Sequence, residues 1–538
     1  MVKERKLTGE WQGFYPGDWV RPRSNPGTWI PLVDVSEIFP GNRSVSRQGE
    51  YNLYDAPVGV EHKIEEATKV PMTFDGEVEW EAEGIGALYM WQEDGKHHLL
   101  YYTSGDRVCY AVSDNAYHWI RPELGELEYN GSRKNNLLGQ PPNGASGFFE
   151  DPSAPPEERF KAMGAEGHWY DPDTWEQLRD AGPEGPGNEA AKRWDAMQYE
   201  GLEYHGPKVV LRGWMVGWTS ADRLHWKQIE EPLADYSVNG GIAARYEPES
   251  GTYFAYMQPQ GFPPEEPKGI GTGVQEAEIV RRANGIARTR DFRHWPPSKL
   301  TMHPDSLDDL DISFYSHNYF PYPGRKDLHG MTVPVFHQRT GQMDVQIAFS
   351  RDGLIWYRPE RKAIITLGPA GSGEECMVGG WMSGLVELPD GYWGVPYTAH
   401  SILHNVKEGF ESSLFPQRQP GKTGWARWQP HRFCGIEAAA AGRFTIPTIS
   451  RRNDELRLNY RCKPGGWISV ELLHMIPSMM HGDVDPLPGF TFGECDRLTG
   501  DCLDQVVTWQ GRSDISRLGE MLAIRLTVFQ AKVFAYQV

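Results

Sequence analysis

Three acidic segments of the chain carry side chains that could perform acid–base chemistry. They are Glu150-Asp151-Pro152, the run from Asp305 to Asp311, and Glu374-Glu375 within a glycine-rich stretch. Hydrolysis of a glycosidic bond needs two carboxyl groups, one that protonates the leaving oxygen and one that attacks the anomeric carbon or activates water. We therefore interpret Glu375 as the acid, Asp151 as the base or nucleophile, and Asp311 as a residue that orients substrate or stabilises the transition state.

Each acidic segment also has a purely structural interpretation. An aspartate before proline often begins a turn, which would account for Asp151. The four aspartates of the second segment could form a solvated loop or a calcium site: Asp305, Asp308, Asp309 and Asp311. Glu374 and Glu375 could be an exposed charge pair. At the level of the sequence, both kinds of interpretation stay open.

Further polar residues are candidates for binding a sugar: Glu79, Arg159, Asn239, His317, His337, Glu374 and His400. Histidine side chains can hydrogen-bond hydroxyl groups or hold a metal, although a histidine within a strand is more often a satisfied core residue. The chain has no HExxH motif, so we predict no catalytic metal site.

A recurring motif indicates the elements that must position these residues. A short β-prone run, a small polar turn and an aromatic residue recur in five segments, of which the last is the least regular: Tyr110–Trp119, Gly217–Trp226, Ile286–Trp295, Ile347–Trp356 and Gly424–Phe433. In such a turn, short polar side chains hydrogen-bond to the neighbouring backbone. Because the aromatic residue then begins the next strand, the motif predicts a β-hairpin.

Strands rich in aromatic residues precede most copies of the motif, so that each unit reads as one four-stranded propeller blade. The five copies predict a five-bladed β-propeller over residues 76–440. The innermost strand of each blade lines the central channel, so we expect the chemistry upstream of each motif. The residues placed at the entrances of the five blades are, in order, Glu79 or Glu81, Asp151, Asn239, Asp309 with Asp311, and Glu374 with Glu375.

The rest of the chain differs in character from the repeats. Alternating strands such as Trp467–Leu472 and Ala523–Val528 predict a C-terminal β-sandwich over residues 441–538. Residues 1–75 are expected to form an N-terminal segment that packs on the propeller. The predicted fold class is therefore all-β, a five-bladed β-propeller followed by a C-terminal β-sandwich.

Several motifs resemble those of a known group of enzymes. The segment Ser350–Trp356 is similar to the S-x-D-G-x-x-W turn of the five-bladed propeller glycosidases, which include the invertase and levanase group and the arabinanase group. The segments Ile120–Gly125, Glu128–Ser132 and Phe149–Lys161 resemble a bacterial branch that is similar to the invertase-type hydrolases and carries a C-terminal β-sandwich. This resemblance covers nearly the whole chain and implies glycoside hydrolase activity.

The catalytic motifs of that group are only partly present. The invertase signature W-M-N-D-P-N-G, whose aspartate is the nucleophile, is absent from the chain. The segment most similar to the R-D-P motif is Glu150-Asp151-Pro152, and Glu375-Cys376 matches the E-C motif that contains the acid. The resemblance therefore does not supply a complete catalytic set.

Composition limits the expected partners and location. The formal net charge of −19 argues against nucleic acid and against an anionic membrane surface. The basic N-terminus is followed by no apolar stretch, so we predict no secretory signal and expect a cytoplasmic location. Six cysteines without a CxxC pair disfavour a thiolate metal site, and Cys495 with Cys502 is the one pair to test for a disulfide.

Together these patterns predict a glycoside hydrolase with a small carbohydrate substrate. Exo action on a furanoside or small oligosaccharide is expected because insertions such as residues 171–208 could wall off the channel mouth. The chemistry requires no cofactor, and the interpretation leaves room for a structural calcium ion and for a homo-oligomer. Two alternatives stay open, a non-catalytic carbohydrate-binding propeller and a metal-assisted lyase or phosphorylase on the same scaffold.

Overall fold

The computed structural model describes residues 27–45, 51–171, 210–258, 282–403, 420–474 and 485–538, with residues 174 and 176, apart from gaps at 83, 104–106, 237, 239–240, 381, 383 and 520. The chain divides into two units. One contains Glu66–Gln429, and the other combines residues up to Glu65 with Pro430–Val538. Within the described residues, no helix is long and apolar enough to cross a membrane.

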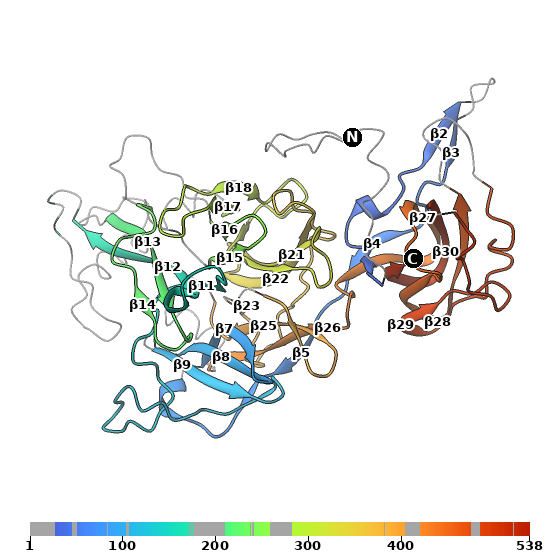
Figure 1. Cartoon of the computed structure of the whole chain (residues 1–538). Coiled ribbons are helices and arrows are strands. Elements are labelled where there is room, and N and C mark those ends of the chain that lie inside the picture. Colours follow the sequence, from blue (N-terminus) through green and yellow to red (C-terminus); the bar gives the residue numbers. More distant parts are fainter. Residues whose placement is uncertain are drawn as a thin grey trace. The chain divides into compact units, whose positions relative to one another are not determined.

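The Glu66–Gln429 unit is a five-bladed β-propeller. Its first blade contains β7 (Ile85–Glu93), β8 (Lys96–Thr103) and β9 (Arg107–Ser113). The second contains β11 (Ala145–Glu150), β12 (Phe160–Tyr170), β13 (Val210–Ser220) and β14 (Lys227–Gln228). The third contains β15 (Ala243–Glu247), β16 (Thr252–Met257), β17 (Asn284–Thr289) and β18 (Lys299–Met302). Figure 1 shows β7, β11, β15 and β23 around the middle of this unit, with β13, β14 and β18 further out.

The last two blades have interrupted inner strands. In the fourth blade, β19 (Ile312–Phe314) and β20 (Asn318–Pro321) both pair with β21 (His329–His337), which pairs with β22 (Gln342–Ser350). In the fifth, β23 (Met377–Gly379) and β24 (Val386–Glu387) both pair with β25 (Trp393–His400), which pairs with β26 (Lys422–Trp428). Between β19 and β20, the amide of Tyr315 still donates to the carbonyl of Pro334 in β21 at 2.9 Å.

The first strand of the unit closes the ring. β5 (Thr68–Pro71) pairs antiparallel with β26 and so becomes the outermost strand of the fifth blade. β6 (Thr73–Phe74) then pairs in parallel with β10 (His118–Trp119) of the first blade. Two short 3-10 turns, η2 (Glu79–Glu81) and η3 (Pro156–Glu158), lie between strands of this unit. Hydrogen bonds between segments far apart in sequence therefore hold the two ends of the propeller together.

The recurring turns have the structure that the motif predicts. The backbone amide of Gly353 donates to Ser350 Oγ at 2.9 Å, and the amides of Leu354 and Ile355 donate to Asp352 Oδ1 at 2.8 and 2.9 Å. The same pattern recurs at the other regular copies of the motif. Most of the tryptophans that follow are buried in apolar clusters shared by neighbouring blades: Trp119, Trp226 and Trp295. The motif is therefore scaffold, as the sequence predicts.

The other unit is the C-terminal β-sandwich. Its strands are β1 (Ile30–Pro31), β2 (Asn42–Val45), β3 (Tyr51–Tyr54), β4 (Glu61–Ile64), β27 (Cys434–Ser450), β28 (Arg457–His474), β29 (Asp501–Val506) and β30 (Met521–Gln537), with a short turn η1 (Val35–Glu37). β28 spans 18 residues, and β27 and β30 span 17 each, far more than ordinary strands. Bulges in these strands let them bend around one apolar core.

The observed domain boundaries differ from those expected from the sequence. β1 pairs with β30 and β4 pairs with β27, so the described residues before Glu66 belong to the same unit as the C-terminal sheet. Residues 66–75 belong to the propeller through β5 and β6. Local patterning did not reveal these pairings because they join segments about 370 or more residues apart. All six cysteines, Cys495 and Cys502 included, are free thiols.

Candidate active site

The three catalytic candidates lie at two different ends of the propeller. Successive blades repeat one order of antiparallel strands around an axis, so their inner strands all run in the same direction. Asp311 and Glu375 precede the inner strands β19 and β23, whereas Asp151 directly follows β11. The prediction that Asp151 enters the second blade is wrong, since Ala145–Glu150 already forms that blade's inner strand. The structure does not bring Asp151 and Glu375 together as a reacting pair.

Asp151 forms a structural cluster between the second and third blades. It is 1% exposed, and it accepts hydrogen bonds from the hydroxyls of Tyr253 and Ser153. Lys161 Nζ lies 3.3 Å from its Oδ2. Burial alone would raise the pKa of Asp151, but the two hydrogen bonds and the charge of Lys161 lower it below the usual value. The carboxylate is thus engaged by the protein, which explains its position without a substrate.

Glu375 is buried at the entrance of the fifth blade. It is 7% exposed, and its Oε2 has no hydrogen-bond partner in the described part of the chain. The surrounding backbone is fixed, because Gln342 Nε2 donates to the carbonyl of Glu375 at 3.2 Å and the amide of Cys376 donates to the carbonyl of His400 at 3.3 Å. Glu375 therefore has a fixed backbone and one buried carboxylate oxygen without a hydrogen-bond partner among the described residues.

The neighbouring strand indicates which way Glu375 faces. Cys376 and Val378 are fully buried, whereas Met377 and Gly379 are partly exposed. Side chains alternate between the two faces of a strand. This alternation groups Glu375 with Met377 and Gly379 on one face of the chain, away from Cys376 and Val378.

Glu374, predicted to bind substrate, is engaged by the protein instead. Lys69 Nζ lies 2.7 Å from its Oε2, and the hydroxyl of Tyr397 donates to its Oε1 at 2.9 Å. Burial and the nearby carboxylate raise the pKa of Tyr397. The two adjacent glutamates thus differ in kind, since Glu374 anchors the segment to β5 and β25 while Glu375 keeps an unpartnered oxygen.

Asp311 and His337 line a polar pocket with a volume of about 580 Å³. We call this cavity the polar pocket. Its lining also includes Asp309, Arg339, Gln342 and Asp344. His337 Nε2 is hydrogen-bonded to Asp344 Oδ2 at a distance of 3.0 Å. This hydrogen bond raises the pKa of His337, whereas partial burial of the ring opposes the shift. Because Gln342 lines this pocket and also contacts the backbone of Glu375, the pocket adjoins the entrance of the fifth blade.

The acidic loop before β19 is anchored by two arginines. Arg358 Nη1 donates to Asp308 Oδ1 at 2.7 Å, and both side chains are almost completely buried. Arg361 Nη2 donates to Asp305 Oδ2 at 2.6 Å. Two of the four carboxylates considered for a calcium site or a solvated loop therefore bind guanidinium groups. Across the described residues, no group of three His, Cys, Asp or Glu is arranged to hold a metal ion.

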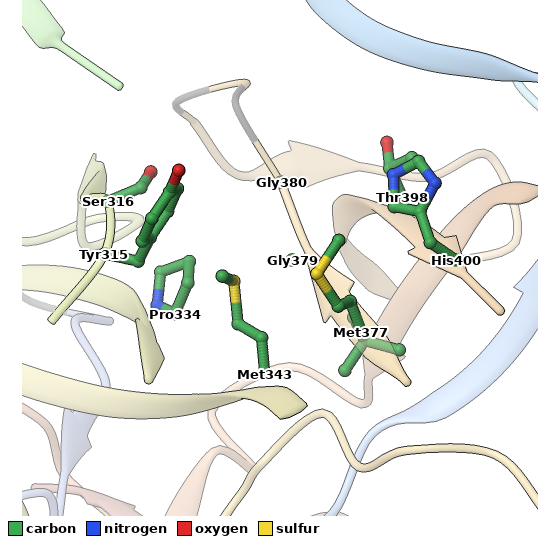
Figure 2. A pocket seen from close by; sticks show the side chains of 10 residues that line it. Tyr315, Ser316, Pro334, Met343, Met377, Gly379, Gly380, Thr398 and His400 are labelled. Carbon is green, nitrogen blue, oxygen red and sulfur yellow. The ribbon is translucent and has the colours of Figure 1, made fainter. Parts of the chain in front are cut away.

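A second, smaller pocket of about 70 Å³ separates the inner strands of the fourth and fifth blades, and we call it the inter-blade pocket. Its apolar lining comes from Pro334, Met343, Met377 and Val378, and its polar lining from Tyr315, Ser316, Thr398 and His400. Figure 2 shows the fourth-blade residues on one side and the fifth-blade residues on the other, with Gly379 and Gly380 between. A Cβ at Gly380 would lie 2.8 Å from the carbonyl oxygen of Pro396, so only glycine allows this approach.

His317 belongs to a buried polar run beside this pocket. It is 1% exposed, its Nδ1 lies 2.6 Å from Asn284 Oδ1, and burial lowers its pKa to about 3. Its Nε2, the Oγ of Ser316 and the Oδ1 of Asn318 are buried without a hydrogen-bond partner among the residues described. Ser316 and His317 lie between β19 and β20, and Asn318 begins β20. Three consecutive side chains thus have buried polar atoms without a hydrogen-bond partner among the described residues, which is unusual in a folded interior.

The remaining predicted binding residues lie elsewhere. Glu79 is exposed in η2 and accepts hydrogen bonds from Asn130 Nδ2 at 3.0 Å. Arg159 Nε donates to Glu150 Oε1 at 2.8 Å, at the same end of the propeller as Asp151. His400 lines the inter-blade pocket, and its role in binding stays a prediction. Asn239 lies outside the described residues.

Several residues of the site escaped the sequence analysis. Ser316, Thr398 and Gly379 line the inter-blade pocket, and Asp344 pairs with His337 in the polar pocket. The available signal was the polar run Ser316–Asn318 inside an otherwise aromatic strand. The others are ordinary strand residues whose role arises only from the packing of two blades.

Comparisons with known proteins find only remote structural likenesses. No protein-family model matches the chain, and no curated protein is similar to it in sequence. An N-acetylgalactosamine deacetylase from F. plautii, solved with blood group B trisaccharide, is 12% identical, with 67% of this chain and 95% of that chain covered and a TM-score of 0.39.

Two glycoside hydrolases show similar likeness. A thermostable family-43 glycoside hydrolase is 12% identical, with 66% of this chain and 89% of that chain covered and a TM-score of 0.35. A family-32 β-fructofuranosidase of Bombyx mori is 10% identical, with 90% of this chain and 94% of that chain covered and a TM-score of 0.36. Likenesses at these TM-scores do not identify a reaction.

Proposed function

We propose that this protein is a glycoside hydrolase that removes a terminal sugar from a furanoside or a small oligosaccharide. Glu375 is the general acid, and Asp311 is the carboxylate that attacks the anomeric carbon or activates water. The observation that carries the proposal is the buried Oε2 of Glu375, which has no hydrogen-bond partner among the described residues. A buried polar atom without a partner costs stability, so an atom supplied by a substrate accounts for it.

The polar pocket supports the role of Asp311. Among the described residues, its carboxylate accepts one long hydrogen bond, from the amide of Arg339 to Oδ2 at 3.3 Å, and it lines the pocket where a ligand could contact it. Gln342 connects this pocket to Glu375 through the backbone. A sugar held across the two positions would thus have one carboxyl group on each side of its scissile bond, as hydrolysis requires.

The size of the inter-blade pocket supports exo action. A volume of about 70 Å³ admits one substituent of a sugar but not a polymer that passes through. Met377 and Gly379, which share the face assigned to Glu375, line this pocket together with Val378. A terminal residue anchored here would present its glycosidic bond to the acid.

The test is a panel of aryl furanosides and pyranosides in both anomeric forms. We expect Glu375→Gln to lower kcat/KM by about 10²- to 10⁴-fold, the usual contribution of a general acid. The loss should be larger on alkyl than on dinitrophenyl glycosides, because a good leaving group needs little protonation. Asp311→Asn should be inactive on both. The exposed Glu157→Gln is the control.

Two outcomes would contradict the proposal. If Glu375→Gln retained the wild-type kcat/KM on alkyl glycosides, Glu375 would not be the acid. If the wild-type protein bound sugars without cleaving any glycoside of the panel, the non-catalytic carbohydrate-binding propeller would be the better interpretation.

A further inference from the structure

The inter-blade pocket differs from an ordinary sugar subsite in its chemistry. Of the ten residues that line it, none is Asp, Glu, Lys or Arg. Its interior is formed by the two thioether side chains of Met343 and Met377 with Pro334 and Val378, while hydroxyl groups stand at one side (Figure 2). Sugar hydroxyl groups need hydrogen-bond partners when they are buried, and thioether sulfur is a weak acceptor.

We propose that this pocket binds a methyl group of the substrate sugar, together with an acceptor oxygen next to that methyl group. The inference rests on the proposed function, because it names the substrate class of the same site. Methionine side chains are adaptable and polarizable, and they pack well around a small apolar group. The methyl group of a 6-deoxy sugar and the methyl group of an acetamido sugar share this chemistry, since each lies close to an oxygen that accepts hydrogen bonds.

Ser316 supplies the polar half of the recognition. It is 1% exposed, it lines the pocket, and its Oγ has no hydrogen-bond partner among the residues that the structure describes. A hydroxyl group in this position can donate to the ring oxygen beside a C6 methyl group or to the carbonyl oxygen of an acetamido group. An apolar floor with one buried donor therefore fits a methyl group next to an oxygen better than it fits a hydroxymethyl group.

Substitution of Gly379 by alanine would fill part of the pocket with one added methyl group. A Cβ at this position would lie 3.7 Å from Met343 Sδ and 3.9 Å from Pro334 Cβ, which is ordinary van der Waals contact. Its backbone does not require glycine, because its φ is not positive. Gly379→Ala should therefore fold and occupy the space that the substrate's methyl group would take. Gly519→Ala, whose Cβ would meet no atom within 4 Å, is the matched control.

The experiment compares aryl glycosides that differ at one substituent of the sugar. Fucoside with galactoside and rhamnoside with mannoside, each pair in the same D or L series, differ as methyl from hydroxymethyl. N-acetylglucosaminide with glucoside differs as acetamido from hydroxyl, and every pair is tested in both anomers. We expect one methyl-bearing member to exceed its partner by about 10- to 200-fold in kcat/KM, the range for one methylene in an apolar pocket. The pair that shows the preference identifies whether the methyl group belongs to a deoxy or an acetamido sugar.

The variants test the pocket itself. Gly379→Ala should lower kcat/KM for the preferred methyl-bearing member more than for its partner, so that the preference is lost, and Ser316→Ala should reduce the preference without changing the shape of the pocket. Gly519→Ala should behave as the wild type does. If Gly379→Ala does not fold, the Ser316→Ala result decides. Equal cleavage of both members of every pair by the wild type would overturn the inference and leave the proposed function intact.

A binding measurement separates failure of this inference from failure of the proposed function. If no glycoside is cleaved, the methyl glycosides of the same six sugars are titrated into the full chain by calorimetry. Binding of a methyl-bearing sugar that Gly379→Ala weakens at least 10-fold would support the pocket assignment without hydrolysis. Absence of any such difference would overturn it.

Discussion

His317 should make the propeller sensitive to acid. Its ring is fully buried, Nδ1 is hydrogen-bonded to Asn284, and Nε2 has no partner among the described residues. Burial is the cause that lowers the pKa of His317 to about 3, so the folded protein keeps this ring neutral where the unfolded chain would protonate it. Replacing His317 by Gln removes the titration while keeping a polar side chain beside Asn284.

The size of the effect follows from proton linkage. With a folded pKa of about 3 and an unfolded pKa of about 6.5, the unfolded state binds more protons throughout the interval between them. The free energy of unfolding therefore falls as the pH drops below about 6.5, by about 1.4 kcal/mol per pH unit. Between pH 7 and pH 5 this one group should remove about 2 kcal/mol of stability.

Urea titrations at pH 7 and pH 5 measure the effect. The quantity of interest is the change in unfolding free energy of the propeller between the two pH values, compared between wild type and His317→Gln. Any constant cost of the substitution cancels in this difference. The variant should lose about 2 kcal/mol less than the wild type on acidification. An identical loss in both proteins would refute the assignment of His317 as a buried neutral ring.

Two further predictions concern ionic contacts. Asp151→Asn should lower the free energy of unfolding by about 3–5 kcal/mol, because it leaves Lys161 buried without its counter-charge; a variant as stable as the wild type in urea would contradict this. For His337, whose pKa is raised by Asp344, the stabilisation should be present below pH about 6.5 and vanish as the pH rises through the raised pKa. His337→Gln should therefore cost about 0.5–1 kcal/mol at pH 6 and almost nothing at pH 9, measured by thermal unfolding.

The fold was predictable because its signal is local and repeated. Each turn of the Ser350-x-Asp352 type is stabilised by side chains within five residues. Four such turns, followed by a less regular fifth copy of the motif, indicate five blades. The pairing of β1 and β4 with the C-terminal strands was not predictable in the same way. It joins residues such as Ile30 and Tyr536, whose alternating pattern would suit any neighbouring sheet.

The site was predictable in part, and the reason lies in what a motif records. The sequence places Glu375 and Asp311 before inner strands, and the structure confirms this position, which sequence order defines. Their catalytic roles stay predictions. Asp151 was misplaced because its segment reads equally well as the start or the end of a strand. The inter-blade pocket was missed because Ser316 and Gly379 belong to different blades, and no local pattern indicates that they meet.

Buried polar atoms without a partner occur at several places among the described residues, and those of Ser316, His317 and Glu375 lie at the junction of the fourth and fifth blades. At the end where inner strands finish, Asp151 is paired with Lys161 and Glu150 with Arg159, although Arg223 Nε there also has no partner among the described residues. A hydrogen-bond partner for a buried polar atom stabilises the fold. Under the proposed function, a ligand whose hydroxyl or ring oxygens meet the atoms at the blade junction would supply such partners.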